Sequence, residues 1–328
     1  MVKFLIIRFS SIGDIVLTTP IIRGLKNQVE NAEVHYLTKP QFAGILDKNP
    51  NIDKLLILKE KLNDTVEEIK GENYDYIIDL HHNLRTSVIK RKTGITSFSF
   101  NKLNLKKWLL VNFKIDMMPK VHIVDRYFDA VSVFDVNPDG KGLNYYITDN
   151  VNPEDMHAAF KGQYMVVVVG ANHFTKQIPV SKIVSIANKT GIPVCLVGGN
   201  DVKQQSGEIE AALKIPFLNT VGKISLNQSA SLIKQCHVVL TPDTGMMHIA
   251  AAFNKNIISL WGNTVPQFGM YPYKAGSKSK IFEVKDLKCR PCSKIGYEKC
   301  PKKHFNCMNN IDDAQIVQYI QELIEKVE

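Results

Sequence analysis

The sequence predicts an α/β protein with two doubly wound parallel sheets. Short apolar runs alternate with segments of helical apolar spacing, which is typical of parallel strands joined by helices. This alternation occurs twice, on either side of a stretch rich in Asn, Asp, Gly and Pro at residues 137–153. The chain has 328 residues, of which 45% are hydrophobic, so it has enough apolar material for two cores. We therefore expect one domain over residues 1–150 and a second over residues 151–310.

The first half begins with a strand, a tight loop and a helix. Residues 2–8 form a compact apolar run, and residues 9–14 carry Ser and Gly. Residues 15–29 have helical spacing, with Pro20 in the first turns. Further strands are predicted at residues 33–37, 54–58 and 74–80.

The second half repeats the pattern with almost purely apolar runs, as expected of strands that are buried on both faces. Its strands are predicted at residues 164–169, 194–197, 238–240 and 256–260. The chain closes with a helix over residues 311–328, for which Asp312 is the predicted cap. One apolar stripe runs along this helix and consists of Ile316, Ile320, Leu323, Ile324 and Val327.

The composition favours an anionic partner and a reducing compartment. The formal charge is +9 and the pI is about 9.1, which suits a nucleotide, a phosphorylated glycolipid, a membrane surface or a nucleic acid. No apolar run is long enough for a signal peptide or a membrane span. Six cysteines without an export signal predict a cytoplasmic protein, which would touch the membrane only from inside.

The first candidate for chemistry is Asp14, in the motif FSSIGD at residues 9–14. This motif follows the first strand, and open parallel sheets gather ligands at the carboxyl ends of their strands. A carboxylate beside a helix N-terminus stays ionised at neutral pH, so Asp14 would accept a proton from an acceptor hydroxyl. The alternative is that Asp14 only caps the helix that follows.

A loop of the second half is the first candidate for binding a diphosphate. Residues 241–252, TPDTGMMHIAAA, follow a strand and open a helix, so free backbone amides and the helix dipole would attract phosphate oxygens. We assign donor contacts there to Asp243, Thr244, Gly245 and His248. A hydrogen-bonded helix residue is the alternative interpretation of His248.

A second loop, GANHFTKQIP at residues 170–179, supplies Lys176 as the cation for the charge that grows on a leaving phosphate. Thr175 would add a hydroxyl donor, and an ordinary solvated lysine is the alternative for Lys176. The loops of the two halves predict a cleft between two domains that face each other. No Asp-x-Asp pair is present to hold Mg²⁺, so Lys176 and helix amides would neutralise the leaving group without a metal. The first strand is not followed by Gly-x-Gly-x-x-Gly, which argues against a dehydrogenase.

These motifs resemble glycosyltransferase family nine, the lipopolysaccharide heptosyltransferases. The likeness rests on FSSIGDIVLTTP, GANHFTKQIP, TPDTGMMHIAAA and LWGNTVPQFGMYPY, and it runs nearly end to end. It implies a GT-B fold of two Rossmann-like domains, with an N-terminal acceptor domain, a C-terminal donor domain and a last helix that packs back on the first domain. It also implies inverting transfer of a heptose or another sugar from an ADP-sugar or related donor to a lipopolysaccharide core. In the family pattern Asp14 is the general base and Lys176 stands at the leaving group.

A basic stretch and several polar residues are candidates for contacts to the acceptor and the membrane. Ten Lys or Arg residues against two acids lie between residues 85 and 126, with Trp108 and Phe113 among them. This stretch suits docking on an anionic inner leaflet, and a solvated basic face is the alternative. The candidate acceptor contacts follow strand ends and are Ser11, Gly13, His81, His82, Asn83 and Arg85.

A short cysteine-rich segment predicts a structural zinc site. Cys289, Cys292, Cys300 and Cys307 are spaced much as in small zinc loops, with His304 between the last two. Free thiols, or a disulfide formed on handling, are the alternatives. We expect no cofactor to be required for catalysis.

Two other functions match parts of the pattern. A nucleotide-sugar epimerase of the same fold would convert the donor without any acceptor. A nucleic-acid binder would use the basic stretch and the cysteines, but it would leave the loops of Asp14 and Asp243 without a purpose. We therefore expect no nucleic-acid partner.

Overall fold

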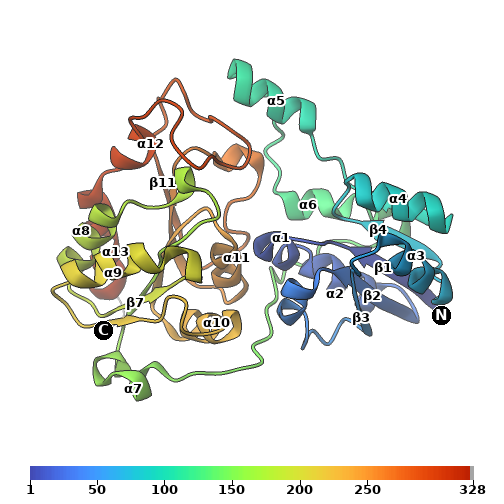
Figure 1. Ribbon diagram of the computed structural model, residues 1–328, viewed down its shortest axis with the longest axis horizontal. Helices are drawn as coiled ribbons and strands as arrows, with labels where there is room; N and C mark the ends of the chain where they lie inside the picture. Colours follow the sequence, from blue (N-terminus) through green and yellow to red (C-terminus); the bar gives the residue numbers. More distant parts are fainter. Residues whose placement is uncertain (326–328) are drawn as a thin grey trace. The chain divides into compact units, whose positions relative to one another are not determined.

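The computed structural model describes residues 1–325, so residues 326–328, with Val327 of the predicted closing helix, lie outside the described part. The chain divides into two compact units, each with its own parallel sheet (Figure 1). The first unit comprises Met1–Leu103 and Val121–Thr148, and the second comprises Asn104–Lys120 and the chain from Asp149 onward. No helix within residues 1–325 has the length and hydropathy that a membrane crossing requires.

The first unit is built on a five-stranded parallel sheet with the order β3-β2-β1-β4-β5. Its strands are β1 (Val2–Ile7), β2 (Ala32–Thr38), β3 (Lys54–Ile57), β4 (Tyr76–Asp79) and β5 (Thr96–Ser99). Its helices are α1 (Ile12–Val16), α2 (Thr19–Gln28), α3 (Leu62–Gly71), α4 (Leu84–Thr93) and α6 (Ile123–Phe128). Ile7 at the end of β1 is aligned with Asp79 at the end of β4, so the loops that follow these strands are neighbours.

The predicted helix over residues 15–29 is two helices, α1 and α2. Thr18 lies between them, and its Oγ1 donates a hydrogen bond to Ile15 O at 2.7 Å, a local bond that competes with continued helix. Pro20 lies in the first turn of α2, where a missing N–H costs nothing. The break leaves α1 as a short helix that carries Asp14.

The second unit is built on a six-stranded parallel sheet with the order β11-β10-β9-β6-β7-β8. Its strands are β6 (Met165–Val168), β7 (Val194–Val197), β8 (Phe217–Asn219), β9 (Val238–Pro242), β10 (Asn256–Trp261) and β11 (Lys280–Glu283). Its helices are α5 (Asn104–Phe113), α7 (Pro153–Met156), α8 (Val180–Thr190), α9 (Lys203–Ala212), α10 (Leu226–Gln235), α11 (Gly245–Ala252), α12 (Asn306–Asn309) and α13 (Asp313–Glu325). The sequence missed β5, β8 and β11, which are short edge strands with partly exposed side chains.

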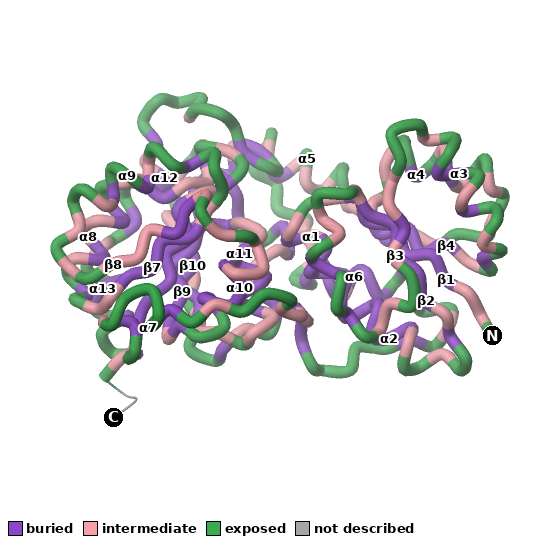
Figure 2. The backbone as a smooth tube through the Cα atoms, turned by 60° about the horizontal axis from the view of Figure 1, so that its bottom comes forward, coloured by how far each residue is buried: buried purple, intermediate pink, exposed green. Residues whose placement is uncertain are grey.

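The cores follow from the composition of the strands. All four residues of β6 are buried, as its apolar sequence predicts for a strand covered on both faces. Figure 2 shows the same contrast in each unit, with the central strands buried and the helices and loops more exposed.

The last helix packs within the second unit. Ile316, Ile320 and Leu323 of α13 join the core of that unit, and α13 lies on α8. Lys182 of α8 forms an ion pair with Asp313 at the start of α13. Each buried side chain of this stripe contributes about 1.5–3 kcal/mol. This face of α13 is covered by α8, and packing of the helix on the N-terminal domain, which the resemblance implied, stays a prediction.

Residues 104–120, which the sequence placed in the first half, also belong to the second unit. Leu110 of α5 packs with Val265 and Phe268, which follow β10. Lys114 Nζ donates to Pro291 O at 2.7 Å. These contacts join α5 to the second unit even though its neighbours in sequence belong to the first, and Figure 1 shows α5 standing clear of the strands.

Candidate active site

Asp14 lies just beyond the carboxyl end of β1, in α1. Its Oδ1 forms an ion pair with Arg8 Nη2 at 2.5 Å. Its Oδ2 accepts hydrogen bonds from Ser11 Oγ at 2.8 Å and from Ser11 N at 3.2 Å. The Ser11 contacts form a capping box, so the capping interpretation describes part of what Asp14 does. The side chain is still 22% exposed, which leaves the carboxylate within reach of a ligand.

Arg8 sets the charge of this carboxylate. Burial by itself would raise the pKa of Asp14, but the positive charge of Arg8 and the bonds from Ser11 hold that pKa below its ordinary value of 3.8. The Arg8 guanidinium is fixed by the chain, because its Nε donates to Ser10 O at 2.8 Å and its Nη1 to Leu80 O at 2.5 Å. Asp14 is therefore ionised at neutral pH, which a proton acceptor requires.

The loop after β4 lies beside Asp14. The ring of His81 packs against Phe9, with 4.8 Å between the ring centroids, and Phe9 directly follows Arg8 in the chain. Burial, followed by the charges of Arg8 and Lys102, lowers the pKa of His81 to about 4. Its imidazole is therefore neutral, and its Nδ1 is buried without a hydrogen-bond partner among the described residues. A neutral imidazole here can accept or donate a hydrogen bond without adding charge.

Asp79 gives this loop its shape. It is fully buried at the end of β4, and its Oδ1 accepts hydrogen bonds from the backbone N–H groups of His81 at 3.1 Å and His82 at 2.7 Å. Lys90 Nζ of α4 lies 2.9 Å from its Oδ2 and balances its charge. Asp79 therefore fixes the backbone that presents His81 beside Asp14.

The other predicted acceptor residues differ in how far their side chains are available to a ligand. Asn83 caps α4, since its Oδ1 accepts from Thr86 N at 3.0 Å, so part of its hydrogen-bonding capacity is used within the chain. Gly13 is buried inside α1. The exposed members of the set are Ser11, His82 and Arg85.

The second unit gathers three loops at the carboxyl edge of its sheet, after the adjacent strands β6, β9 and β10. Lys176 Nζ of the first loop lies 2.6 Å from Asp243 Oδ2 of the second loop. Thr264 of the third loop donates to the same oxygen from its Oγ1 at 2.8 Å. The predicted residues Lys176 and Asp243 are thus in direct contact. An incoming phosphate would compete with Asp243 for the ammonium group of Lys176.

The helix α11 begins immediately after Asp243. Its N-cap residue Thr244 forms no side-chain capping bond, so the side chain leaves the backbone N–H groups of Gly245 and Met246 to other acceptors, while Met247 N donates to Thr244 O at 3.2 Å. His248 lies one turn further on and is only 2% exposed. The helix start is thus the open part of this segment, and His248 is enclosed by protein.

Thr175 is held by the chain itself. Its Oγ1 accepts a hydrogen bond from Tyr297 N at 2.8 Å and donates to Tyr297 O at 3.2 Å, and its backbone N–H donates to the same carbonyl at 3.1 Å. A Cβ on Gly262 would come within 2.7 Å of Thr175 O, so glycine is needed there. The hydroxyl that the sequence assigned to the donor is therefore occupied by Tyr297, and Thr175 anchors the backbone next to Lys176.

The sequence profile of glycosyltransferase family 9 (heptosyltransferase) matches residues 64–303 of this chain. The chain belongs to this family. This family 9 glycosyltransferase is 24% identical to lipopolysaccharide heptosyltransferase 1 of Campylobacter coli, in a match that covers 98% of both proteins. The resemblance drawn from the motifs is thereby confirmed, and so is the class of enzyme.

Solved structures show the fold of the family 9 glycosyltransferase. A glycosyl transferase of family 9 from Veillonella parvula matches with a TM-score of 0.79 at 19% identity, over 99% of this chain and 97% of that one. The ADP-heptose lps heptosyltransferase II of E. coli matches with a TM-score of 0.74 at 19% identity, over 99% of both chains. The predicted GT-B fold, with one parallel α/β sheet in each unit, is confirmed.

The four clustered cysteines of the family 9 glycosyltransferase are free thiols. Burial and the neighbouring thiols of Cys289 and Cys300 raise the pKa of Cys292 to about 11. Burial and the other three thiols raise the pKa of Cys307 to about 12. Within residues 1–325, no group of three or more His, Cys, Asp or Glu side chains is placed to hold a metal ion. These residues therefore do not fit a zinc site in the arrangement seen here.

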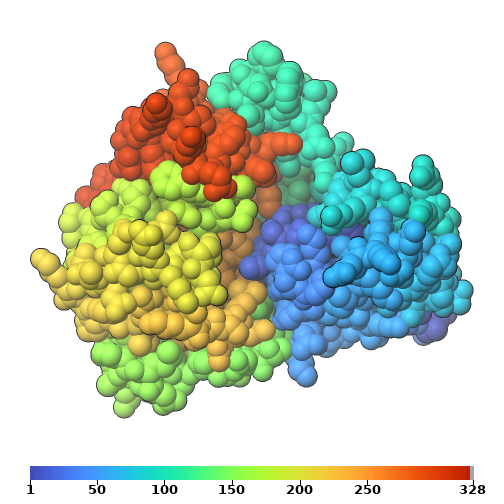
Figure 3. Space-filling view, in the orientation of Figure 1, coloured from blue at the N-terminus to red at the C-terminus, as the bar shows by residue number. Residues whose placement is uncertain are grey.

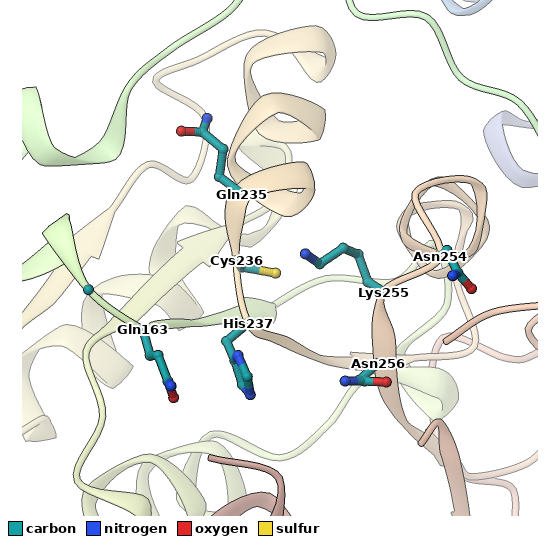
Figure 4. Close-up of a pocket in the computed structure, with 8 residues that line it drawn as sticks. Gln163, Gln235, Cys236, His237, Asn254, Lys255 and Asn256 are labelled. Carbon is teal, nitrogen blue, oxygen red and sulfur yellow. The ribbon is translucent and has the colours of Figure 1, made fainter. Parts of the chain in front are cut away.

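A separate pocket of about 500 Å³ lies at the opposite edge of the second sheet, where β9 and β10 begin. Figure 4 shows its polar lining, in which Lys255 extends toward Cys236. His237 in this lining has its Nε2 3.1 Å from Leu323 O of α13. The pocket contains none of the residues that the sequence predicted for the site.

Sequence reasoning missed residues that hold the site together. Arg8 directly follows the apolar strand β1 and Asp79 ends β4, and a charged residue at the end of an apolar run was the available signal. Arg290 was missed as well, although it donates from Nε to Gly262 O at 2.6 Å and from Nη2 to Thr264 O at 2.8 Å. Nothing in its sequence neighbourhood points to a partner almost thirty residues earlier.

Proposed function

We propose that this family 9 glycosyltransferase transfers a heptose from ADP-heptose to a lipopolysaccharide core, with inversion at the anomeric carbon and without a metal. The names of the Campylobacter coli and E. coli relatives support these substrates. The observation that carries the chemistry is the pair of Arg8 and Asp14, which keeps a partly exposed carboxylate ionised at the end of β1.

Asp14 acts as general base in the proposed reaction. The acceptor hydroxyl oxygen forms a bond to the anomeric carbon, and the hydroxyl proton passes to a carboxylate oxygen of Asp14. The bond from that carbon to the diphosphate breaks at the same time, and the nucleoside diphosphate leaves with the electron pair. One displacement of this kind inverts the configuration at the anomeric carbon.

Lys176 and the start of α11 stabilise the leaving diphosphate. The ammonium group of Lys176 turns from Asp243 to the phosphate, whose negative charge grows as the bond breaks. The backbone amides of Gly245 and Met246, at the start of α11, donate to the phosphate oxygens. His248 is buried in the same helix, and its contact to the donor stays a prediction.

Lys176 and the amides at the start of α11 carry the charge of the leaving group in the proposed reaction, so no metal takes part in catalysis. Metal analysis of the purified protein tests the structural zinc that the spacing of the clustered cysteines predicts. We also propose that the protein works on the inner side of the cytoplasmic membrane, since its six cysteines, all free in the structure, suit a reducing compartment.

The central experiment follows release of ADP from ADP-heptose with and without a lipopolysaccharide core acceptor. Wild-type protein releases ADP and extends the core only when both substrates are present, and a chelator leaves the rate unchanged. Asp14→Asn lowers kcat by about 10²–10⁴-fold while affinity for ADP-heptose stays near the wild-type value. The control is Glu30→Gln, which neutralises an exposed carboxylate ahead of β2, at the other edge of the first sheet.

Other outcomes would replace parts of the proposal. Near wild-type turnover of Asp14→Asn would remove Asp14 as the base. Conversion of the donor to an isomeric nucleotide sugar without any acceptor would identify an epimerase instead. Stronger thermal stabilisation by a UDP-, GDP- or CMP-sugar than by ADP-heptose would change the donor, since at equal concentration the ligand that binds more tightly stabilises the native state more.

A further inference from the structure

A short stretch of the second unit exposes an unusual number of large apolar side chains. We define the α5 segment as residues 104–120. It contains five of them, each between 50% and 70% exposed: Leu105, Trp108, Phe113, Ile115 and Met117. In Figure 3 this segment, in blue-green, lies open at the surface. Contiguous exposed apolar groups on a folded protein mark a surface that binds something.

The helix α5 has two apolar sides with different roles. Leu110 faces the protein and packs with Val265 and Phe268. Leu105 and Trp108 are three residues apart, so they share a face, and helical geometry places that face opposite Leu110. The inner side anchors the helix, and the outer side is left to solvent in the isolated chain.

Positive charge surrounds the exposed apolar side. The α5 segment carries four lysines, at 106, 107, 114 and 120, against the single acid Asp116. Lys114 Nζ donates to Pro291 O and so ties the segment to residues 288–303, the cysteine-rich loop. This loop adds five exposed lysines, at 288, 294, 299, 302 and 303, against the single acid Glu298, and the exposed apolar residues Ile295 and Tyr297.

We propose that the α5 segment and the loop at residues 288–303 together form a docking surface for an anionic phospholipid bilayer. Apolar and aromatic side chains framed by lysines are what the boundary between acyl chains and anionic headgroups binds. A second copy of this chain is a poor occupant, because it would set lysines against lysines. The sequence had assigned membrane contact to a basic stretch in the first half, whereas this surface belongs to the second unit.

The location of this surface fits a transferase that acts on a membrane-bound acceptor. Val265 and Phe268, which hold α5, follow β10 at the same sheet edge as Lys176 and Asp243. Tyr297 of the loop is bonded to Thr175, the residue before Lys176. Docking would therefore bring the donor loops to the bilayer surface. The inference rests on the proposed function only for the glycolipid acceptor, since binding to lipid is measured without any transfer.

The test is co-sedimentation with vesicles of equal parts phosphatidylglycerol and phosphatidylcholine, compared with pure phosphatidylcholine. Wild-type protein binds the anionic vesicles, and binding weakens as salt is added. Lys106→Glu with Lys294→Glu, one from each part of the surface, weakens binding by at least about thirtyfold, since each lysine near an anionic surface contributes ~1 kcal/mol. Trp108→Ser with Phe113→Ser weakens it as well.

The matched control is Lys161→Glu with Lys214→Glu, which makes the same change of charge at exposed positions ahead of β6 and β8. It keeps wild-type vesicle binding. All variants keep the wild-type rate on a deacylated, water-soluble core acceptor, which shows that they fold.

Equal binding of wild-type protein to neutral vesicles, or unchanged binding by the surface variants, would overturn the docking surface. So would a wild-type dimer that Trp108→Ser with Phe113→Ser converts to a monomer, because a second copy would then be the occupant. Absence of transfer to the soluble acceptor by wild-type protein would overturn the proposed function and leave the docking result intact.

Discussion

Removal of the Arg8 charge should move the pH profile of the enzyme. The perturbation is Arg8→Met, which keeps an apolar stem and removes the guanidinium that lies 2.5 Å from Asp14 Oδ1. Two unit charges about 4 Å apart at an effective dielectric constant of about 20 interact by about 4 kcal/mol. That energy corresponds to about three pH units, and neighbouring charges typically shift a carboxyl pKa by about one to three units.

The direction of the pKa shift follows from the environment of Asp14. Its pKa is below 3.8 in the wild-type protein because Arg8 and Ser11 outweigh the effect of burial. Without Arg8, less opposes the effect of burial, and the pKa of Asp14 rises. Asp14 is then protonated, and inactive as a base, at a higher pH than in the wild-type protein. The acid limb of kcat/KM, which reports the free enzyme, therefore moves up by about one to three pH units in Arg8→Met. Arg8→Lys keeps a charge and should stay close to the wild-type limb.

The free energy of unfolding should also depend on the ion pair between Arg8 and Asp14. Since the pKa of Asp14 is lower in the folded chain than in the unfolded chain, its ionised form stabilises the fold above the ordinary value of 3.8. This contribution is lost as the pH falls through the folded pKa. Arg8→Met removes it at neutral pH as well, at a cost below the ~3–5 kcal/mol of breaking a fully buried pair, because the Asp14 side chain is 22% exposed. If Arg8→Met loses activity with its acid limb unmoved, Arg8 is only a structural residue and the charge argument fails.

Three further variants test the rest of the site. Lys176→Ala should lower kcat by about 10²–10³-fold and weaken ADP-heptose binding in calorimetry, and unchanged kinetics would remove this lysine from the site. Thr175→Val loses the bonds to Tyr297 and should lower kcat about tenfold or more through the position of Lys176, whereas Thr175→Ser should restore it. Asp79→Asn should raise KM for the acceptor without changing KM for the donor, because the loop of His81 loosens, and an equal rise in both would contradict this.

The sequence was sufficient for the sheets because their strands are nearly pure apolar runs. β6 and β7 are buried on every residue, so composition alone marks them. The short strand β5, with the sequence TSFS, has no such run, and its pairing with β4 depends on the finished sheet. Edge strands of this kind have too few apolar residues to be predicted from local pattern.

The site was predictable where it depends on strand ends and unpredictable where it depends on long-range bonds. Asp14, Lys176 and Asp243 lie in the segments that follow strands, so topology alone places them at a sheet edge. The hydrogen bonds between Thr175 and Tyr297 join residues that are 122 positions apart, and no local sequence pattern predicts them.

The position of α5 has a consequence for dissecting the protein. The chain passes from one unit to the other after Leu103, after Lys120 and after Thr148. A fragment that ends at Thr148 would contain α5 but not Val265 and Phe268, so Leu110 would be exposed. The complementary fragment would expose Val265 and Phe268. On the ribosome, likewise, α5 emerges long before the residues that shelter it, so nascent chains pass through a stage in which this helix is open to chaperones.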